Sequence, residues 1–140
     1  MRVVLDTSVI VSGLRSRNGA SHLVLGAVAR QRIRPLVSTA LFLEYEAVLL
    51  RAEHRLVTGM TPADITGFLA AFASAAEGVE VHFQWRPQLR DPADELVLEA
   101  AVNGRAVALV THNVADFQPA ASRFGIPVWT PATLLEELSE

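Results

Sequence analysis

The sequence predicts an α/β fold of three layers, in which helices cover both faces of a central, mainly parallel sheet of about five short strands. Short apolar runs alternate with longer segments of helical periodicity along the 140-residue chain, the order expected of strands joined by helical crossovers. The first run, Val3 to Leu5, is apolar at every position, as expected for a strand buried on both faces. Loops are short and no linker or repeat interrupts the pattern, so we expect one domain spanning residues 1–140.

The individual elements follow from apolar runs and helix-start chemistry. Strands are predicted at residues 3–5, 36–38, 79–81, 106–110 and 125–128. Helices are predicted at residues 21–32, 39–53, 61–76, 91–102 and 130–138, with a turn and a short helix at 111–116 and another helix at 120–124. Three of the helix starts carry a capping side chain followed by proline, at Thr61-Pro62, Asp91-Pro92 and Thr130-Pro131.

Composition excludes several kinds of site. The chain has no cysteine, which excludes disulfides, thiolate metal sites and cysteine nucleophiles. It opens on a strand rather than a signal-like segment, and no apolar run reaches transmembrane length, so we expect a cytoplasmic protein without a membrane partner. The formal net charge is -3, so overall charge does not indicate a nucleic-acid-binding protein.

Arginines gather in the first half of the chain. There is no lysine, and seven arginines lie between Arg15 and Arg55. This stretch is a candidate phosphate-binding surface, with Arg15, Arg17 and Arg32 as the candidate RNA-binding residues. An ordinary solvated surface of mixed charge is the simpler explanation. Substituting the three arginines together separates the two, because a phosphate-binding surface would lose RNA affinity and salt dependence.

Four acidic residues are expected to meet at one edge of the sheet. Asp6 follows the first strand directly, and Asp116 follows the fourth strand by six residues. If these two strands are neighbours, both acids lie at the topological switch point, where open α/β sheets bind ligands. Asp94 lies in the first turn of the helix before the fourth strand, and Glu44 lies about one turn into the helix after the second strand. Carboxylates clustered in a partly buried crevice persist best with a cation between them.

Several of these acids also have a purely structural explanation. Asp94 fits a helix-start acid, because Asp91-Pro92-Ala93-Asp94 repeats the arrangement of Thr61-Pro62-Ala63-Asp64, where nothing indicates a site. Asp6 and Asp116 likewise fit helix caps. At this point the residues alone leave both explanations open.

Glu44 has apolar neighbours three and four residues away, a setting in which a carboxylate should be paired, protonated or metal-bound. Glu46 has equally apolar neighbours, so periodicity does not choose between the two. The histidines lack metal-ligand spacing and are interpreted as surface or capping residues, with His112 alone near the acids. There is no glycine-rich phosphate loop and no serine–histidine–aspartate arrangement.

Four motifs follow one another along the chain: Val3-Val4-Leu5-Asp6-Thr7-Ser8, Leu43-Glu44-Tyr45, Asp91-Pro92-Ala93-Asp94, and Val110-Thr111-His112-Asn113-Val114-Ala115-Asp116-Phe117. In order and spacing they resemble the motifs of the PIN domain, and especially of its small stand-alone prokaryotic members, which include VapC-type toxins. The resemblance covers nearly the whole chain and selects Glu44 over Glu46. Ser8 stands where many members have asparagine, and Asn113 stands where some relatives carry another acid.

The resemblance implies a metal-dependent ribonuclease that hydrolyses phosphodiester bonds of single-stranded RNA with Mg²⁺ or Mn²⁺. The catalytic and metal-binding acids it implies are Asp6, Glu44, Asp94 and Asp116. Supporting residues around them are Thr7, Ser8, Asp91, Thr111 and Asn113. A toxin of this kind would have a cognate antitoxin protein as partner, and the small family members commonly form homodimers.

Two other classes of protein stay open at this stage. One is a non-catalytic PIN-like module that binds RNA or a partner protein. The other is a flavodoxin-like or response-regulator-like domain, in which Asp near strand ends binds Mg²⁺ for phosphoryl transfer, but the absence of any lysine argues against it. A small antitoxin-like reading frame just upstream would favour the toxin nuclease.

Overall fold

The computed structural model describes residues 1–139. Over these residues the chain forms five strands and eight helices. The strands are β1 (Arg2–Leu5), β2 (Arg34–Val37), β3 (Glu77–Gly78), β4 (Ala108–Val110) and β5 (Val128–Trp129). The helices are α1 (Thr7–Arg15), α2 (Ala20–Ala29), α3 (Thr39–Leu49), α4 (Ala52–Thr58), α5 (Pro62–Ala75), α6 (Pro92–Gly104), α7 (Val114–Arg123) and α8 (Pro131–Leu138).

The five strands form one parallel sheet in the order β3-β2-β1-β4-β5, which confirms the predicted α/β fold. The first and fourth strands are neighbours, with Val3, Val4 and Leu5 paired to Ala108, Leu109 and Val110. Strand order reverses between β1 and β4, because the chain moves outward to β2 and β3 on one side and to β5 on the other. The carboxyl ends of β1 and β4 therefore form the topological switch point of the sheet.

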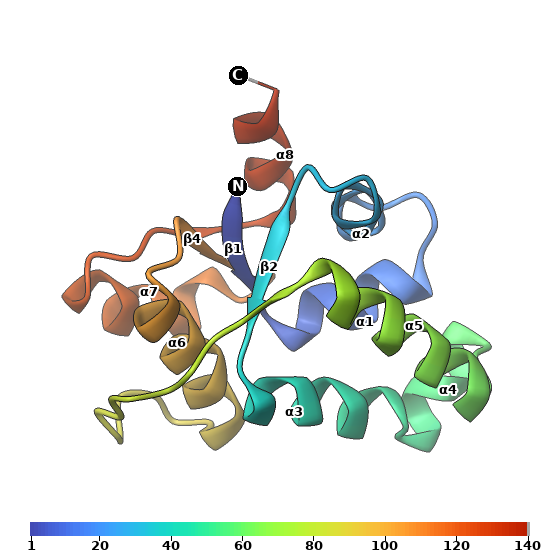
Figure 1. Ribbon diagram of the computed structural model, residues 1–140, viewed down its shortest axis with the longest axis horizontal. Helices are drawn as coiled ribbons and strands as arrows, with labels where there is room; N and C mark the ends of the chain where they lie inside the picture. The colour runs from blue at the N-terminus through green and yellow to red at the C-terminus, as the bar shows by residue number, and fades with distance from the viewer. Residues whose placement is uncertain (140) are drawn as a thin grey trace.

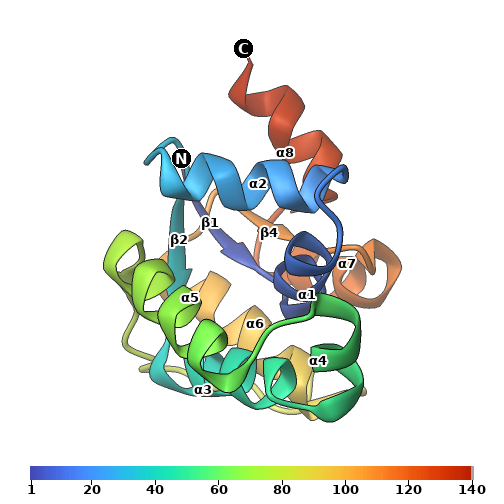
Figure 2. The same ribbon diagram turned by 90° about the vertical axis from the view of Figure 1, so that its right-hand side faces the viewer.

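Helices cover both faces of the sheet. Figure 1 shows α6 and α7 on one side of the central strands and α1 and α2 on the other, and α6 contacts β1, β2 and β4. Figure 2 shows α3 and α4 beyond the ends at which the central strands finish. These two helices therefore form a wall over the carboxyl edge, where the predicted acids lie.

The two central strands, β1 and β4, lie in the hydrophobic core and are held in place by the burial of their side chains. All three residues of β4 are fully buried, and so are Val3, Val4 and Leu5 of β1. Burial of each such aliphatic side chain stabilises the fold by about 1.5–3 kcal/mol. Polar groups that follow these strands are consequently held at defined positions.

The predicted helix over residues 39–53 is wrong in one respect, because the structure divides it into α3 and α4. Arg51 adopts an extended backbone with φ of -61° and ψ of 135° between them. No glycine or proline marks this break in the sequence. Contacts of α4 with α1 and α3 accompany the change of direction, which is therefore a feature of tertiary packing.

Other boundaries also differ from those predicted. The third strand occupies Glu77–Gly78 rather than residues 79–81, and Glu77 is held there by ion pairs with Arg2 (2.6 Å) and Arg34 (3.4 Å). The fifth strand begins only at Val128. Helix α1 was not among the predicted helices, because its apolar run Val9-Ile10-Val11 has no helical period. The two short helices predicted at 111–116 and 120–124 are one helix, α7, with Pro119 inside it.

Within residues 1–139, no single helix is long and apolar enough to cross a membrane; the pair α4 and α5 meets the criteria only together, across an 83° bend. Cytoplasmic location and a single domain over residues 1–140 stay predictions.

Candidate active site

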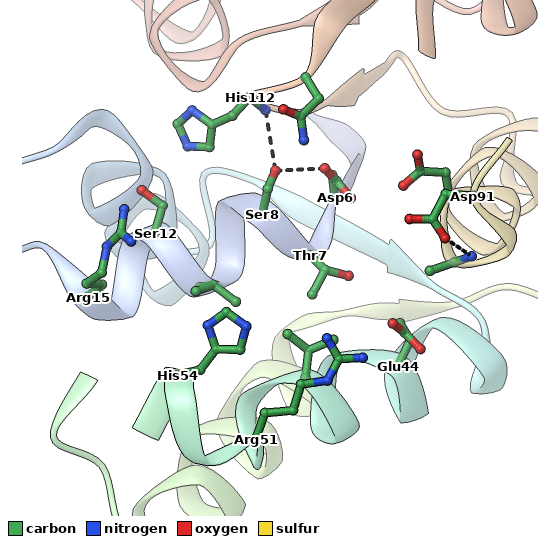
Figure 3. Close-up of a pocket in the computed structure, with 15 residues that line it drawn as sticks. Asp6, Thr7, Ser8, Ser12, Arg15, Glu44, Arg51, His54, Asp91 and His112 are labelled. Atoms are coloured by element: carbon green, nitrogen blue, oxygen red, sulfur yellow. Dashed lines mark hydrogen bonds between the residues drawn. The ribbon is translucent and has the colours of Figure 1, made fainter. Parts of the chain in front are cut away.

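A cavity of about 690 Å³ opens at the carboxyl edge of the sheet. Its walls come from the end of β1, the start of α6, the turn after β4, and helices α1, α3 and α4. Eight residues predicted from the sequence line it: Asp6, Thr7, Ser8, Arg15, Glu44, Asp91, Asp94 and Asn113. Figure 3 shows how several of these side chains lie around the cavity.

Asp6 is the buried centre of the site, with only 5% of its surface exposed. Its backbone N–H donates to the carbonyl of Val110 (2.8 Å), which continues the pairing of β1 with β4 past the strand ends. The carboxylate Oδ2 accepts hydrogen bonds from Ser8 Oγ (2.7 Å) and Thr111 Oγ1 (2.8 Å). Asp6 occupies the N-cap position of α1, but its carboxylate makes no capping hydrogen bond with the helix backbone and instead accepts from these two hydroxyls. With both bonds on Oδ2, Oδ1 is the oxygen available to a ligand in the cavity.

The turn after β4 fixes Asp6 from the other side. Thr111 is fully buried, and its hydroxyl accepts the backbone N–H of Asn113 (2.9 Å) while donating to Asp6. Ser8 Oγ accepts the backbone N–H of His112 at 3.4 Å, as Figure 3 shows. The predicted supporting residues Ser8 and Thr111 thus hold the carboxylate of Asp6 in one orientation.

Helix α3 is attached to the same strand end by its tyrosine. Tyr45 is buried and its hydroxyl donates to the carbonyl of Leu5, the residue before Asp6. Burial, with a smaller contribution from the charge of Asp6, raises the pKa of Tyr45 well above its ordinary value, so the hydroxyl stays a neutral donor. Glu44 precedes Tyr45 and lines the cavity, whereas Glu46 is not among the lining residues.

Two acids at the start of α6 have different roles. Asp91 is the N-cap, and its Oδ1 accepts the backbone N–H of Ala93 (2.9 Å). Asp94 is half-buried in the first turn, and its pKa is raised from 3.8 to about 6, first by burial and then by the charges of Asp6, Asp91 and Asp116. The cap is therefore supplied by Asp91, and Asp94 carries an uncompensated charge.

The start of helix α5 can be compared with the start of α6, because both carry an aspartate three residues after the cap residue. There Asp64 completes a capping box, in which its carboxylate accepts the N–H of Thr61 (2.9 Å) and Thr61 Oγ1 accepts the N–H of Asp64 (3.1 Å). These hydrogen bonds lower the pKa of Asp64. Asp94 stands at the corresponding position of the similar Asp-Pro-Ala-Asp motif, but no capping box forms there, because the cap hydrogen bond of α6 is made by Asp91, and burial raises the pKa of Asp94.

Asp116 lies beside the main cavity rather than in it. It is exposed in the first turn of α7 and lines an adjoining pocket of about 470 Å³, to which Asp91 and Asp94 also contribute. Among residues 1–139, no three acidic or histidine side chains converge closely enough to form a ready-made metal site. The fold thus brings the four predicted acids to one edge without assembling them into one coordination sphere.

The donor set nevertheless suits a hard divalent cation. Carboxylate and hydroxyl oxygens are the ligands that Mg²⁺ and Mn²⁺ prefer. Burial, and after it the charges of the neighbouring acids, raise the pKa of Asp94, and a bound cation would stabilise its charged form. Asp6 and Asp94, with Glu44 across the cavity, are the residues that could hold such an ion.

The cavity also has basic lining residues, two of which the sequence analysis missed. Arg51 is the N-cap of α4 and His54 lies in its first turn, and Figure 3 shows them with Arg15 on the side of the cavity away from Asp91. The expectation that His112 alone among the histidines lies near the acids is wrong, because His54 also lines the cavity. Only the break between α3 and α4, which has no local sequence signal, brings these two side chains here.

The three arginines proposed for RNA binding do not share one surface. Arg15 lines the cavity, and Arg17 is exposed in the loop that follows α1. Arg32 lies just before β2, at the opposite edge of the sheet, where its guanidinium donates to the carbonyl of Leu138 (3.3 Å). The arginines that line the main cavity are therefore Arg15 and Arg51.

The fold and the site define a class: a three-layer α/β domain with acids gathered at the carboxyl edge of a parallel sheet. The family model described as the PIN domain matches residues 2–115, and the chain belongs to that family. The family is a nuclease fold family whose members generally use divalent metal ions. No curated protein and no solved structure gave a significant match to this chain.

Proposed function

We propose that this chain is a metal-dependent endoribonuclease that hydrolyses phosphodiester bonds of single-stranded RNA. The observation that carries the proposal is the convergence of Asp6, Glu44 and Asp94 on one cavity at the carboxyl edge of the sheet, where burial and the neighbouring acids raise the pKa of Asp94. Charge that is destabilising in the free protein is expected where a cation is to be bound.

A bound Mg²⁺ or Mn²⁺ would activate water and neutralise charge on the phosphate. Asp6 Oδ1 and the Asp94 carboxylate would hold the ion, with Asp116 contributing from the adjoining pocket. Glu44 would orient the attacking water or accept its proton from the opposite wall. Ser8 and Thr111 keep Asp6 Oδ2 occupied.

The opposite charges around the cavity suit a phosphodiester chain. The acids would face the scissile phosphate through the metal, while Arg15 and Arg51 would bind neighbouring phosphates. His54 is half-buried beside them and would donate a hydrogen bond to the substrate. This arrangement binds RNA through its backbone on one side and cleaves it on the other.

The biological role we propose is that of a toxin paired with an antitoxin protein, acting in the cytoplasm as a homodimer. This part rests on the family resemblance. Co-expression with a small protein encoded immediately upstream, followed by growth and cleavage assays, tests it. Growth arrest that the upstream protein does not relieve would contradict the pairing.

Cleavage of a panel of labelled single-stranded RNAs, in Mn²⁺, Mg²⁺ or EDTA, tests the enzymatic proposal. We expect metal-dependent cutting by the wild type and by Glu46→Gln, whose side chain lies outside the cavity, but none by Asp6→Asn. Cutting that persists in Asp6→Asn would place the activity elsewhere. Absence of cutting together with absence of metal binding would identify a non-catalytic PIN-like module instead.

A further inference from the structure

Three aromatic rings form a stack on the surface near the acids. Phe83 and Trp85 have ring centroids 5.5 Å apart at an interplanar angle of 27°, and Trp85 and Phe124 are 5.1 Å apart at 48°. Phe83 is 62% exposed and Trp85 is 41% exposed. The backbone of Phe83 is held by Asn103, whose side chain accepts its N–H (3.1 Å) and donates to its carbonyl (3.0 Å). Phe83 and Trp85 lie outside the hydrophobic core, whereas Phe124 is half-buried and packs against it.

Buried acids of α6 hold the segment that carries Trp85. Glu99 is 5% exposed and makes a two-point ion pair with Arg86 (2.5 and 2.8 Å). Glu95 is 4% exposed and accepts the backbone N–H groups of Gln88 (2.6 Å) and Leu89 (2.9 Å). These charges are used structurally, and they fix a segment that has no regular secondary structure of its own. The aromatic stack is therefore presented on a pre-organised support.

The stack adjoins the pocket that Asp94 and Asp116 line, because Gln88 lines that pocket and its side-chain amide donates to the carbonyl of Trp85. Phe124 follows Arg123, whose guanidinium donates to Gln88 Oε1 (2.9 Å). Arg123 and Arg90 line the pocket of about 470 Å³ that also contains Asp94 and Asp116. Arg90 makes no ion pair within the part of the chain that the structure describes. Two arginines thus share a pocket with the acids, and one of them, Arg123, directly precedes a ring of the stack.

We propose that Phe83, Trp85 and Phe124 form a platform on which unpaired bases of the RNA substrate stack, while Arg90 and Arg123 bind the phosphates between the platform and the scissile bond. The inference rests on the proposed ribonuclease function and names what the site recognises. Exposed aromatic faces next to cations are the recurring means of binding single strands, because every base has a face that stacks. In a duplex the bases already stack on one another, so the platform selects single-stranded RNA.

Binding can be measured apart from cleavage by fluorescence anisotropy in EDTA, with a fluorescein-labelled single-stranded oligoribonucleotide of mixed sequence. We expect Trp85→Ala and Phe83→Ala each to weaken binding about tenfold, and Trp85→Phe to retain most of the affinity. Val107→Ala is the matched control, because Val107 is an apolar residue 46% exposed at the opposite edge of the sheet. Unchanged affinity in Trp85→Ala would overturn the proposal.

A second measurement does not depend on whether the alanine variants fold. The chain has two tryptophans, so Trp129→Phe leaves Trp85 as the only one. Stacking of a base on Trp85 should quench its emission, and an oligonucleotide with abasic sites should quench it less. Emission unchanged at saturating RNA would refute the platform and leave the rings as a docking surface for a protein. Metal-dependent cleavage by the wild type is scored separately, so failure of the platform and failure of the ribonuclease are distinguishable.

Discussion

Replacing Asp94 with asparagine should stabilise the metal-free protein at neutral pH. The pKa of Asp94 is raised from 3.8 to about 6, which corresponds to about 3 kcal/mol of cost for its charged form. The side chain is still partly open to water, and screening reduces this cost to about 1–2 kcal/mol. Loss of the attraction between the charge and the amino end of α6 offsets about 0.5 kcal/mol. The expected net gain is therefore about 1 kcal/mol.

The difference in stability between Asp94→Asn and the wild type should depend on pH. A carboxyl whose pKa is raised by folding contributes stability that is complete below 3.8 and is lost as the pH rises through about 6. Asparagine resembles the protonated form, so its advantage should be absent near pH 4 and complete above about pH 7. Urea unfolding in EDTA across this interval measures the difference.

Asp64→Asn is the matched control, because it stands at the same position of the same helix-start motif with a lowered pKa. It should destabilise the protein under the conditions in which Asp94→Asn stabilises it. A variant at Asp94 that is no more stable than the wild type above pH 7, or whose effect does not depend on pH, would refute the reasoning. Adding Mn²⁺ should reverse the order, since only the wild type retains the full set of acids.

Further predictions concern the walls of the cavity. Glu44→Gln should lower the rate of RNA cleavage at least about 100-fold, whereas Glu46→Gln, two positions along α3 and outside the cavity, should leave the rate unchanged; equal losses would contradict the assignment. Thr111→Val removes a buried hydroxyl that binds a carboxylate and should cost about 2 kcal/mol in urea unfolding. A cost near zero would mean that this bond does not fix the site. Arg51→Ala should weaken RNA binding and reduce its salt slope by about 1, while Arg32→Ala, at the opposite edge, should change neither.

The parts of the fold that depend on local chemistry could be predicted from the sequence. The apolar runs at Val3–Leu5 and Ala108–Val110 identify strands buried on both faces, and the alternation with helices predicts that they are parallel. Capping chemistry at Thr61, Asp91 and Thr130 marks three helix starts that the structure contains. The positions of the acids relative to these elements follow from the topology.

The parts that depend on packing could not be predicted. The break at Arg51 has no glycine or proline, and it accompanies contacts of α4 with α1 and α3 in the folded chain, where Arg51 and His54 line the cavity. Likewise, Asp64 and Asp94 occupy similar motifs, but hydrogen bonds with Thr61 lower the pKa of Asp64, whereas burial and acids that include Asp6 and Asp116 raise the pKa of Asp94. Sequence patterns describe a residue and its near neighbours along the chain, whereas the burial of Asp94 and its approach to Asp6 and Asp116 depend on the tertiary fold.

Calorimetric titration of Mn²⁺ into the purified protein tests the central claim, that the acids at this edge hold a divalent cation, without requiring the correct RNA. The account predicts saturable binding by the wild type and by Glu46→Gln, and loss of that binding in Asp6→Asn. Circular dichroism of each variant establishes that the fold is retained. Binding that is unchanged in Asp6→Asn would contradict the claim, and so would the absence of binding by a folded wild type.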